Sequence, residues 1–266
     1  MASTRPNGPL TKPEIGRVWS QGFEALGTRL GEILIAAFFF GGLPVALLRV
    51  VSGHISIAYG TSIWMKLVTT VAMSTLTSVL GVTAAYALIS RLVVSVLDGR
   101  AEPAASAIDN VVRRFPALIV MATLVNCGVG LATILLIVPG LMLMSAWAMV
   151  IQTASMEKLG PIEALRRSAA LTRGARWQVF GVIVVLGIAG GVGIYLINRF
   201  ANAFYGGAGA FNLELSQGWP LWYIAATAVF QCFVISVSAA VHAALYVQLR
   251  DWKDGPDADN LAEVFA

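Results

Sequence analysis

The chain has 266 residues, of which 58% are hydrophobic and 12% are charged, and its mean hydropathy is +0.78. Soluble domains are about 45–50% apolar and about 25% charged, so this composition excludes a water-soluble enzyme. In a membrane protein the basic excess, a net charge of +4, reports orientation, and we expect no nucleic-acid partner.

The N-terminal segment 1–12 is interpreted as a disordered leader. The first apolar run begins only after some 31 residues. This run is long enough to cross a membrane, whereas the apolar region of a cleaved signal peptide has about 7–15 residues. We therefore expect the first span to be an anchor and the protein to reside in a bacterial inner (plasma) membrane.

Runs of about 20 predominantly apolar residues, enough to cross a hydrocarbon core about 30 Å thick, recur along the chain. Six spans are predicted: 32–51, 65–86, 117–138, 141–155, 177–197 and 219–240. The third and fourth spans are predicted to meet at a tight corner at Pro139 and Gly140, because both residue types break helices. The fourth span is short, so the alternative for this pair is a shallow re-entrant hairpin that does not cross fully.

A short basic segment opened by a proline precedes each odd-numbered span. The three segments are 13–20, 103–114 and 161–168. Proline suits the first turn of a helix, where its missing N–H costs nothing. We therefore predict an all-α polytopic membrane protein in which residues 13–250 form three transmembrane hairpins, each preceded by an interfacial helix.

The third of these segments has the clearest amphipathic pattern. Ile162, Leu165 and Ala169 share one predicted stripe, and Gly174 is placed to end the helix. The basic residues in and after this segment are Arg166, Arg167, Arg173 and Arg176. A helix of this kind can lie among lipid headgroups, where each basic residue contributes about 1 kcal/mol of attraction to anionic lipid. These arginines are candidates for binding anionic lipid or a partner, and the alternative is that they only set the orientation.

Charge placement predicts the orientation of the chain. With both termini inside, 15 of the 18 Lys and Arg residues fall on the cytoplasmic side, and only Arg49, Lys66 and Arg199 fall outside. Such a split is a strong positive-inside signal. It also supports an even number of spans, because removing one span would scatter the basic loops over both faces. We expect both termini in the cytoplasm.

The C-terminal tail 251–266 differs in character from the spans. From Arg250 onward the chain holds five acidic residues against two basic ones. Gly255 and Pro256 are expected to break the last helix. One interpretation is that this acidic cytoplasmic tail folds back on the basic loops or binds a membrane or cytoplasmic protein partner. The other is a solvated, disordered tail.

The sequence contains no recognisable catalytic constellation. Its two cysteines lie in apolar runs and its two histidines are far apart, so no disulfide framework or metal cluster is predicted. Glu157 and Glu163 are expected to be ion-pair and helix-dipole partners, and Asn126 and Gln231 to hydrogen-bond between helices. Charged residues are nearly missing from the span interiors, which weighs against ion coupling. We expect no enzymatic activity, cofactor or metal.

Residues 137–147 and 157–177 form a recurring pattern: a Pro-Gly pair, a Glu-Ala-Leu-x-x-Ser helix and a Leu-Thr-x-Gly turn. This pattern resembles the signature of the glycerophosphoryl diester phosphodiesterase membrane-domain family, which includes YciC-like bacterial inner-membrane proteins. The motif positions are Pro139, Gly140, Pro161, Glu163, Ala164, Leu165, Ser168, Leu171, Thr172 and Gly174.

The resemblance implies the six-span fold and structural roles for these positions. In this family the membrane domain is sometimes joined to a soluble phosphodiesterase domain, and many members stand alone without an assigned activity. This chain lacks the His and carboxylate set of that soluble domain, so the family name implies no hydrolysis here.

The sequence thus favours a non-catalytic membrane protein that organises the membrane or serves as an accessory subunit. Its basic cytoplasmic face would meet anionic lipid headgroups or a protein partner. The alternative is a transporter or lipid-moving protein without intramembrane ion coupling. The glycine-rich fifth span and the polar face of the second span are compatible with that alternative.

Overall fold

The computed structural model describes residues 12–59, 64, 68, 72, 75, 76, 78–99, 102–157, 159–204 and 220–255. Within these residues the chain forms helices and no strand. Six helical segments in this part of the chain are long and apolar enough to cross a membrane: Leu30–Val51, Val79–Leu97, Ala104–Leu135, Val138–Met156, Arg176–Phe204 and Leu221–Asp254. The protein is an all-α polytopic membrane protein, as the sequence predicts. Nearly all of the predicted leader, much of the second span and most of the acidic tail lie outside the described residues.

The described part of the chain consists of α-helices and two π-helical turns. In chain order they are α1 (Ile15–Thr28), α2 (Leu30–Ala37), the π-helical turn η1 (Phe38–Gly42), α3 (Leu43–Tyr59), the π-helical turn η2 (Ser78–Val82), α5 (Thr83–Leu97), α6 (Ala104–Leu135), α7 (Ile137–Ala146), α8 (Val150–Met156), α9 (Pro161–Thr172), α10 (Arg176–Phe204) and α12 (Leu221–Asp254).

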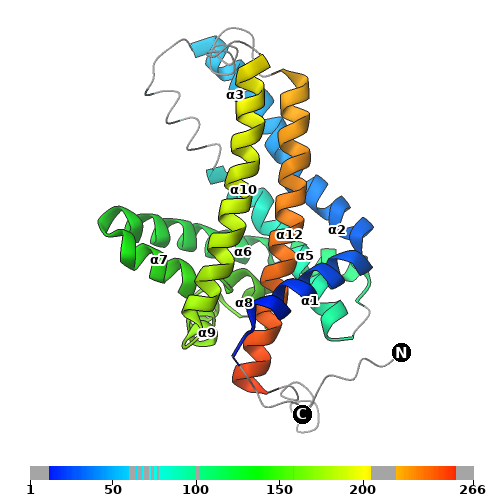
Figure 1. Cartoon of the computed structure of the whole chain (residues 1–266), viewed down its shortest axis with the longest axis vertical. Coiled ribbons are helices and arrows are strands. Elements are labelled where there is room, and N and C mark those ends of the chain that lie inside the picture. The colour runs from blue at the N-terminus through cyan, green and yellow to red at the C-terminus, as the bar shows by residue number, and fades with distance from the viewer. Residues whose placement is uncertain are drawn as a thin grey trace.

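Helices α10 and α12 pack side by side along the long axis of the molecule (Figure 1). They run in opposite directions, so α10 begins and α12 ends at the end of the molecule that carries α9. We call this the basic end, because Arg166, Arg173, Arg176 and Arg250 lie there. Little of α10 is buried within the protein, as suits an apolar helix surrounded by lipid.

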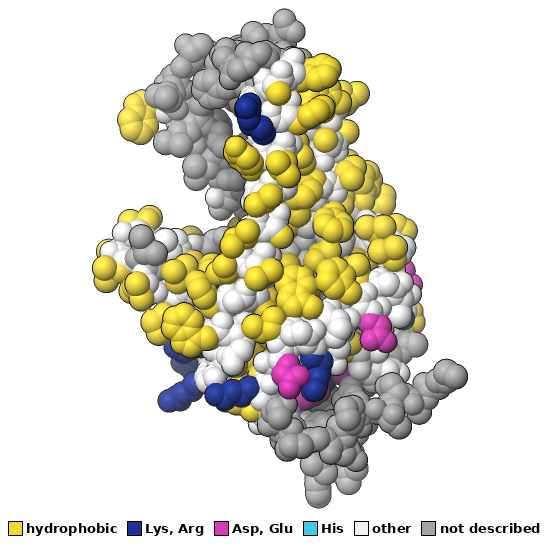
Figure 2. Space-filling model, viewed as in Figure 1, with side chains coloured by type: hydrophobic (Ala, Val, Ile, Leu, Met, Phe, Trp, Pro, Cys, Tyr) yellow, Lys and Arg dark blue, Asp and Glu magenta, His cyan; other side chains and the backbone are white. Residues whose placement is uncertain are grey.

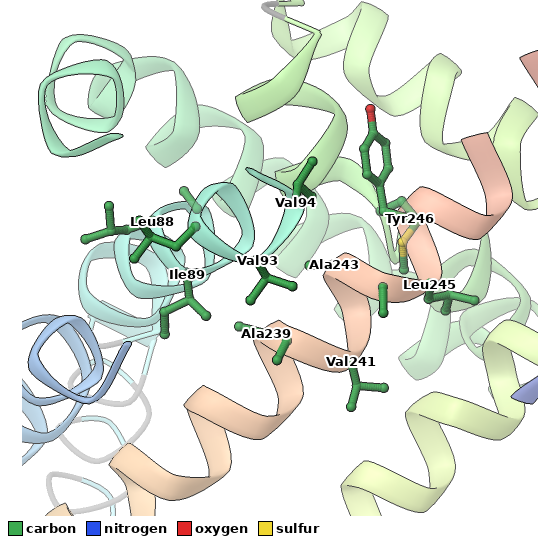
Figure 3. Packing of buried hydrophobic residues seen from close by; sticks show 14 of the residues in the cluster. Leu88, Ile89, Val93, Val94, Ala239, Val241, Ala243, Leu245 and Tyr246 are labelled. Atoms are coloured by element: carbon green, nitrogen blue, oxygen red, sulfur yellow. The ribbon is translucent and has the colours of Figure 1, made fainter. Parts of the chain in front are cut away.

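Helix α12 forms the core of the bundle. It packs against α1, α2, α5 and α10, and its Tyr246 is fully buried. Figure 3 shows Ile89 and Val93 of α5 directed toward the side of α12 that carries Ala239 and Ala243. Small side chains at such positions let two helix backbones approach closely, which stabilises association where lipid is as apolar as the protein.

Helix α1 begins at Ile15, within the first predicted segment 13–20 but after its proline, and extends beyond that segment to Thr28. It contacts α12 and α5. Val18, Gly22 and Ala25 are buried, whereas Ile15 and Phe23 are exposed. Arg29 separates α1 from α2, so this segment forms a helix of its own. Its location at a membrane interface stays a prediction.

The second predicted amphipathic segment, 103–114, does not form a separate helix. It continues into the third predicted span as the single 32-residue helix α6. Pro116 lies inside this helix and removes one backbone hydrogen bond. The residues around it include no glycine that would end the helix. At this position the structure departs from the repeat that the sequence predicts.

The corner between α6 and α7 lies at Leu136, whose backbone is extended (φ −155°, ψ 127°). The sequence predicts this corner at Pro139 and Gly140, and that position is wrong, because both residues lie in the first turn of α7. Proline is tolerated there since the first N–H groups of a helix have no partner within it. A Cβ at Gly140 would lie 2.7 Å from Thr133 Cα, so glycine lets α7 pack closely on α6.

The C-terminal part of α6 and the whole of α7 form an arm that runs across the direction of α10 and α12 (Figure 1). The two helices pack against each other. The exposed apolar side chains at its tip are Ile134, Leu135, Leu136 and Val138. In Figure 2 the arm projects as a lobe that carries many hydrophobic side chains. The sequence predicts a hairpin here but not this transverse orientation.

Candidate functional site

Helix α9 begins with the signals that the sequence suggests. Pro161 occupies the first turn, and Gly160 precedes the helix with an extended backbone. The backbone N–H of Gly160 donates to Glu163 Oε2 at 3.3 Å. The Glu163 carboxylate therefore both caps the helix and lies near the positive end of its dipole.

The buried face of α9 differs from the predicted stripe. The buried residues are Ala164, Ser168, Leu171 and Thr172, all of them motif positions. Ile162, which we assigned to the apolar stripe, is 62% exposed, and Leu165 is only half-buried. The helix is rotated about its axis relative to the predicted orientation, because the hydroxyl groups of Ser168 and Thr172 also face the protein.

Those hydroxyls form hydrogen bonds at a break between two neighbouring helices, α7 and α8. The fourth predicted span consists of α7 and α8, separated by a turn at 147–149. Ser168 Oγ donates to the carbonyl of Ala146 (2.8 Å) and accepts from the N–H of Met149 (3.1 Å). Thr153 Oγ1 donates to the carbonyl of Ala164 at 3.3 Å. The Ala146 carbonyl and the Met149 N–H, which flank the break, thus both find a partner in Ser168 of α9.

Gly174 ends the motif. Its φ of +91° lies in the left-handed region that favours glycine, and a Cβ there would lie 3.2 Å from Trp252 Cη2. The chain turns at this residue from α9 into α10. Most motif positions are therefore gathered at the junction of α7, α8, α9 and α10, whereas Pro139 and Gly140 lie nearer the arm tip.

Arg167 is paired with two acidic side chains of the same chain. Its Nε lies 2.7 Å from Glu157 Oε2, and its Nη1 lies 3.2 Å from Asp254 Oδ1. Tyr246 donates its phenolic hydrogen to Glu157 Oε1 at 3.0 Å. The hydrogen bond to Asp254 raises the pKa of Arg167, burial lowers it by less, and Glu157 raises it further. The prediction that Glu157 is an ion-pair partner is confirmed.

The other candidate arginines lie closer to the surface. Arg166 and Arg173 are exposed, and Arg176 is half-buried. Trp177 is 83% exposed beside them. Figure 2 shows Lys and Arg side chains gathered at the lower end of the molecule, directly below hydrophobic ones. We call the set of Ile162, Arg166, Arg173 and Trp177 the α9 corner.

Two further ion pairs near the basic end escape sequence reasoning. Arg91 Nη2 lies 2.7 Å from Glu102 Oε1, and Arg250 Nη2 lies 2.8 Å from Asp98 Oδ1. Arg29 Nη1 also donates to the backbone carbonyl of Glu102 at 2.7 Å. Charge counting finds these cations near span ends, but it contains no signal for their partners.

A half-open cavity of about 240 Å³ lies between α6, α7 and α8 on one side and η2, α5, α10 and α12 on the other. Its wall is mostly apolar and includes Val125, Ile151 and Ile183. Asn126 and His242 also line it. Asn126, which we expected to bond to another helix, donates to the carbonyl of Ala122 in its own helix at 2.8 Å.

The structure thus defines a polytopic membrane protein with a basic corner and a mainly apolar cavity between its helices. Among its described residues, no cluster of three or more His, Cys, Asp or Glu side chains is placed to hold a metal ion. No family model, curated protein or solved structure matches the chain. The resemblance to the glycerophosphoryl diester phosphodiesterase membrane-domain family therefore stays a prediction.

Proposed function

We propose that this protein is a non-catalytic, membrane-organising protein or accessory subunit whose α9 corner binds anionic lipid headgroups. The observation that carries the proposal is the α9 corner itself. Exposed Arg166 and Arg173 stand beside exposed Ile162 and Trp177 at the basic end. Cations next to apolar and aromatic side chains are what a headgroup layer over hydrocarbon favours.

The pairing of side chains refines the candidate set. Arg167 is neutralised by Glu157 and Asp254, so we assign it to the architecture of the corner. Arg166 and Arg173 remain exposed and are the cations best placed to meet a phosphate. Each contributes about 1 kcal/mol near an anionic surface.

The membrane and the orientation belong to the same proposal. The basic end would face the cytoplasm, as the positive-inside rule favours, with both termini inside and the chain in a bacterial inner membrane. The arm would then lie along the membrane in the half of the bilayer nearest the cytoplasm. The exposed apolar side chains at the tip of the arm support a membrane-organising role in which the arm occupies one leaflet of the bilayer.

The test compares anionic-lipid binding in two double variants. R166Q/R173Q should weaken phosphatidylglycerol binding by about 10- to 30-fold, since about 1 kcal/mol is lost per arginine. The matched control is R17Q/R113Q, which removes two exposed arginines that are already paired with Glu14 and Asp109. It should stay within about twofold of the parent.

Native mass spectrometry of the purified full chain, titrated with phosphatidylglycerol and with phosphatidylcholine, measures both affinities. Equal phosphatidylglycerol affinity in R166Q/R173Q and the parent would overturn the proposal. Equal loss in both double variants would mean that net charge, rather than the α9 corner, attracts the lipid.

The cavity favours a second candidate, a lipid-moving protein or transporter without ion coupling. Its lining comes from helices on both sides of the arm, so movement of the arm would change its size. Substrate-dependent flux of a labelled lipid across liposomes containing the protein would support this function.

A further inference from the structure

The half-open cavity between the arm and the bundle is lined by two hydrogen-bond acceptors for which the described part of the chain supplies no partner. The Nδ1 atom of His242 lies 2.7 Å from the carbonyl of Ser238. A carbonyl only accepts, so Nδ1 carries the hydrogen and Nε2 of the neutral ring is an acceptor. Asn126 donates through Nδ2 to Ala122, which leaves its Oδ1 as the second acceptor. Neither Nε2 nor Oδ1 has a hydrogen-bond partner among the described residues.

The two acceptors border a mainly apolar cavity, Asn126 from an exposed position and His242 from a half-buried one. Polar groups taken out of water cost free energy unless they are hydrogen-bonded. The remaining wall is mainly apolar, with Val125, Val129 and Ile151 among its residues. Besides Asn126 and His242, the polar side chains that line the cavity are those of Thr83, Tyr86 and Trp147, so most of its wall offers no hydrogen bond to water.

We infer that the cavity binds an uncharged membrane amphiphile that carries a free hydroxyl group, with diacylglycerol as the representative. Its hydroxyl donates to His242 or Asn126, and an acyl chain packs along the apolar wall. None of the described residues that line the cavity is Lys or Arg, so an anionic headgroup finds no counter-charge among them. This site is separate from the α9 corner and does not rest on the function proposed for it.

The experiment uses a diacylglycerol with a photoreactive acyl chain, added to the purified full chain in detergent. Unlabelled diacylglycerol should compete for crosslinking, whereas the same lipid with its hydroxyl acetylated should compete at least fivefold less well. The crosslinked peptides should contain cavity residues such as Met144, Ile151 or Ile183.

Three variants and a control separate the site from the lipid-facing surface. H242F and N126L keep a similar side-chain shape but remove an acceptor, and each should lower affinity about five- to tenfold. A148L adds volume within the cavity and should lower affinity at least tenfold. The control A189L adds the same volume on the exposed face of α10 and should bind like the parent.

The proposal is overturned if the acetylated lipid competes equally well, or if A148L binds like A189L. It is also overturned if crosslinks fall only on outward residues of α10 such as Ile188 and Val192. Thermal unfolding of each variant identifies any that fails to fold, and the competition between the two lipids on the parent chain does not depend on a variant. Because the probe is uncharged, failure here leaves the result for phosphatidylglycerol at the α9 corner unaffected.

Discussion

Ser168 and Thr172 stand one turn apart on α9, and both hydroxyls reach the carbonyl of Ala146. That carbonyl belongs to the last residue of α7, where the helix can no longer supply a partner. Met149 presents its N–H in the same turn and donates it to Ser168. The spacing of the motif is therefore explained at the residue scale by the needs of a broken neighbouring helix.

Replacing Ser168 by alanine should lower the free energy of unfolding by about 1–3 kcal/mol, because a buried N–H and a buried carbonyl lose a partner. Ser20 is the matched control, since its hydroxyl is exposed and bonds only to its own helix. S20A should change stability by less than about 0.5 kcal/mol. Thermal unfolding in detergent compares them, and equal melting temperatures for S168A and S20A would contradict this role.

The ion pairs of Arg167 with Glu157 and Asp254 should contribute to the free energy of unfolding by an amount that does not depend on pH. The pKa of Arg167 is raised above its ordinary value, chiefly by the hydrogen bond to Asp254. A raised folded pKa stabilises the protein fully below the unfolded pKa and loses that effect only as the pH rises through the folded pKa. R167Q should therefore cost about 1 kcal/mol, equally at about pH 6 and about pH 9. A penalty that disappears at the higher pH in thermal unfolding, or one matched by R17Q, would contradict this.

At the scale of elements, the arm depends on close contact between α6 and α7. Gly140 allows that contact because its missing Cβ leaves room for the backbone of Thr133. Elsewhere on α6, Gly130 has open space around the position of its own missing Cβ. A side chain would therefore clash at Gly140 of α7, whereas there is room for one at Gly130 of α6.

Substitution of each glycine by alanine should therefore shift stability in opposite directions. G140A should destabilise the protein by about 1–3 kcal/mol through overpacking. G130A should stabilise it by about 0.5–1 kcal/mol, because alanine is the better helix former. Melting temperatures of the two variants and the parent decide this. A neutral or stabilising G140A would contradict the packing of the arm.

The elements that the sequence predicts well are those determined by local patterns of consecutive residues. Apolar length identifies the spans, and proline followed by an acidic residue identifies the start of α9. The position of the corner at Leu136 is harder to predict from sequence. Pro139 and Gly140 are residue types that usually break helices, but here Pro139 lies in the first turn of α7 and Gly140 allows close packing. The buried face of α9 escaped the apolar pattern because Ser168 and Thr172 are polar, and the partners of Arg91 and Arg250 depend on folding alone.

At the scale of the whole molecule, the transverse arm favours the shallow alternative for the third and fourth spans. α10 and α12 follow the long axis, and the arm runs across it (Figure 1). If these two helices lie along the membrane normal, the arm tip lies within the bilayer and does not reach the opposite surface. The fourth span would then contribute to a hairpin buried in one leaflet.

Cysteine labelling tests the depth of the arm. In a C127A background, Leu136→Cys at the tip should resist a membrane-impermeant maleimide added from the periplasmic side. Leu221→Cys is the control, because Leu221 is 80% exposed at the start of α12, at the end opposite the basic end. It should react readily. Equal labelling of both cysteines would mean that the arm crosses the membrane fully.

The α9 corner is the centre of this account, and the lipids carried by the protein from its own membrane test it most directly. The parent and R166Q/R173Q are extracted gently and measured by native mass spectrometry, with bound lipids and proteins recorded together. The parent should retain anionic phospholipid that the double variant has lost, while both keep the same fold by thermal unfolding. An identical complement of anionic lipid on the two proteins would contradict the assignment of the α9 corner.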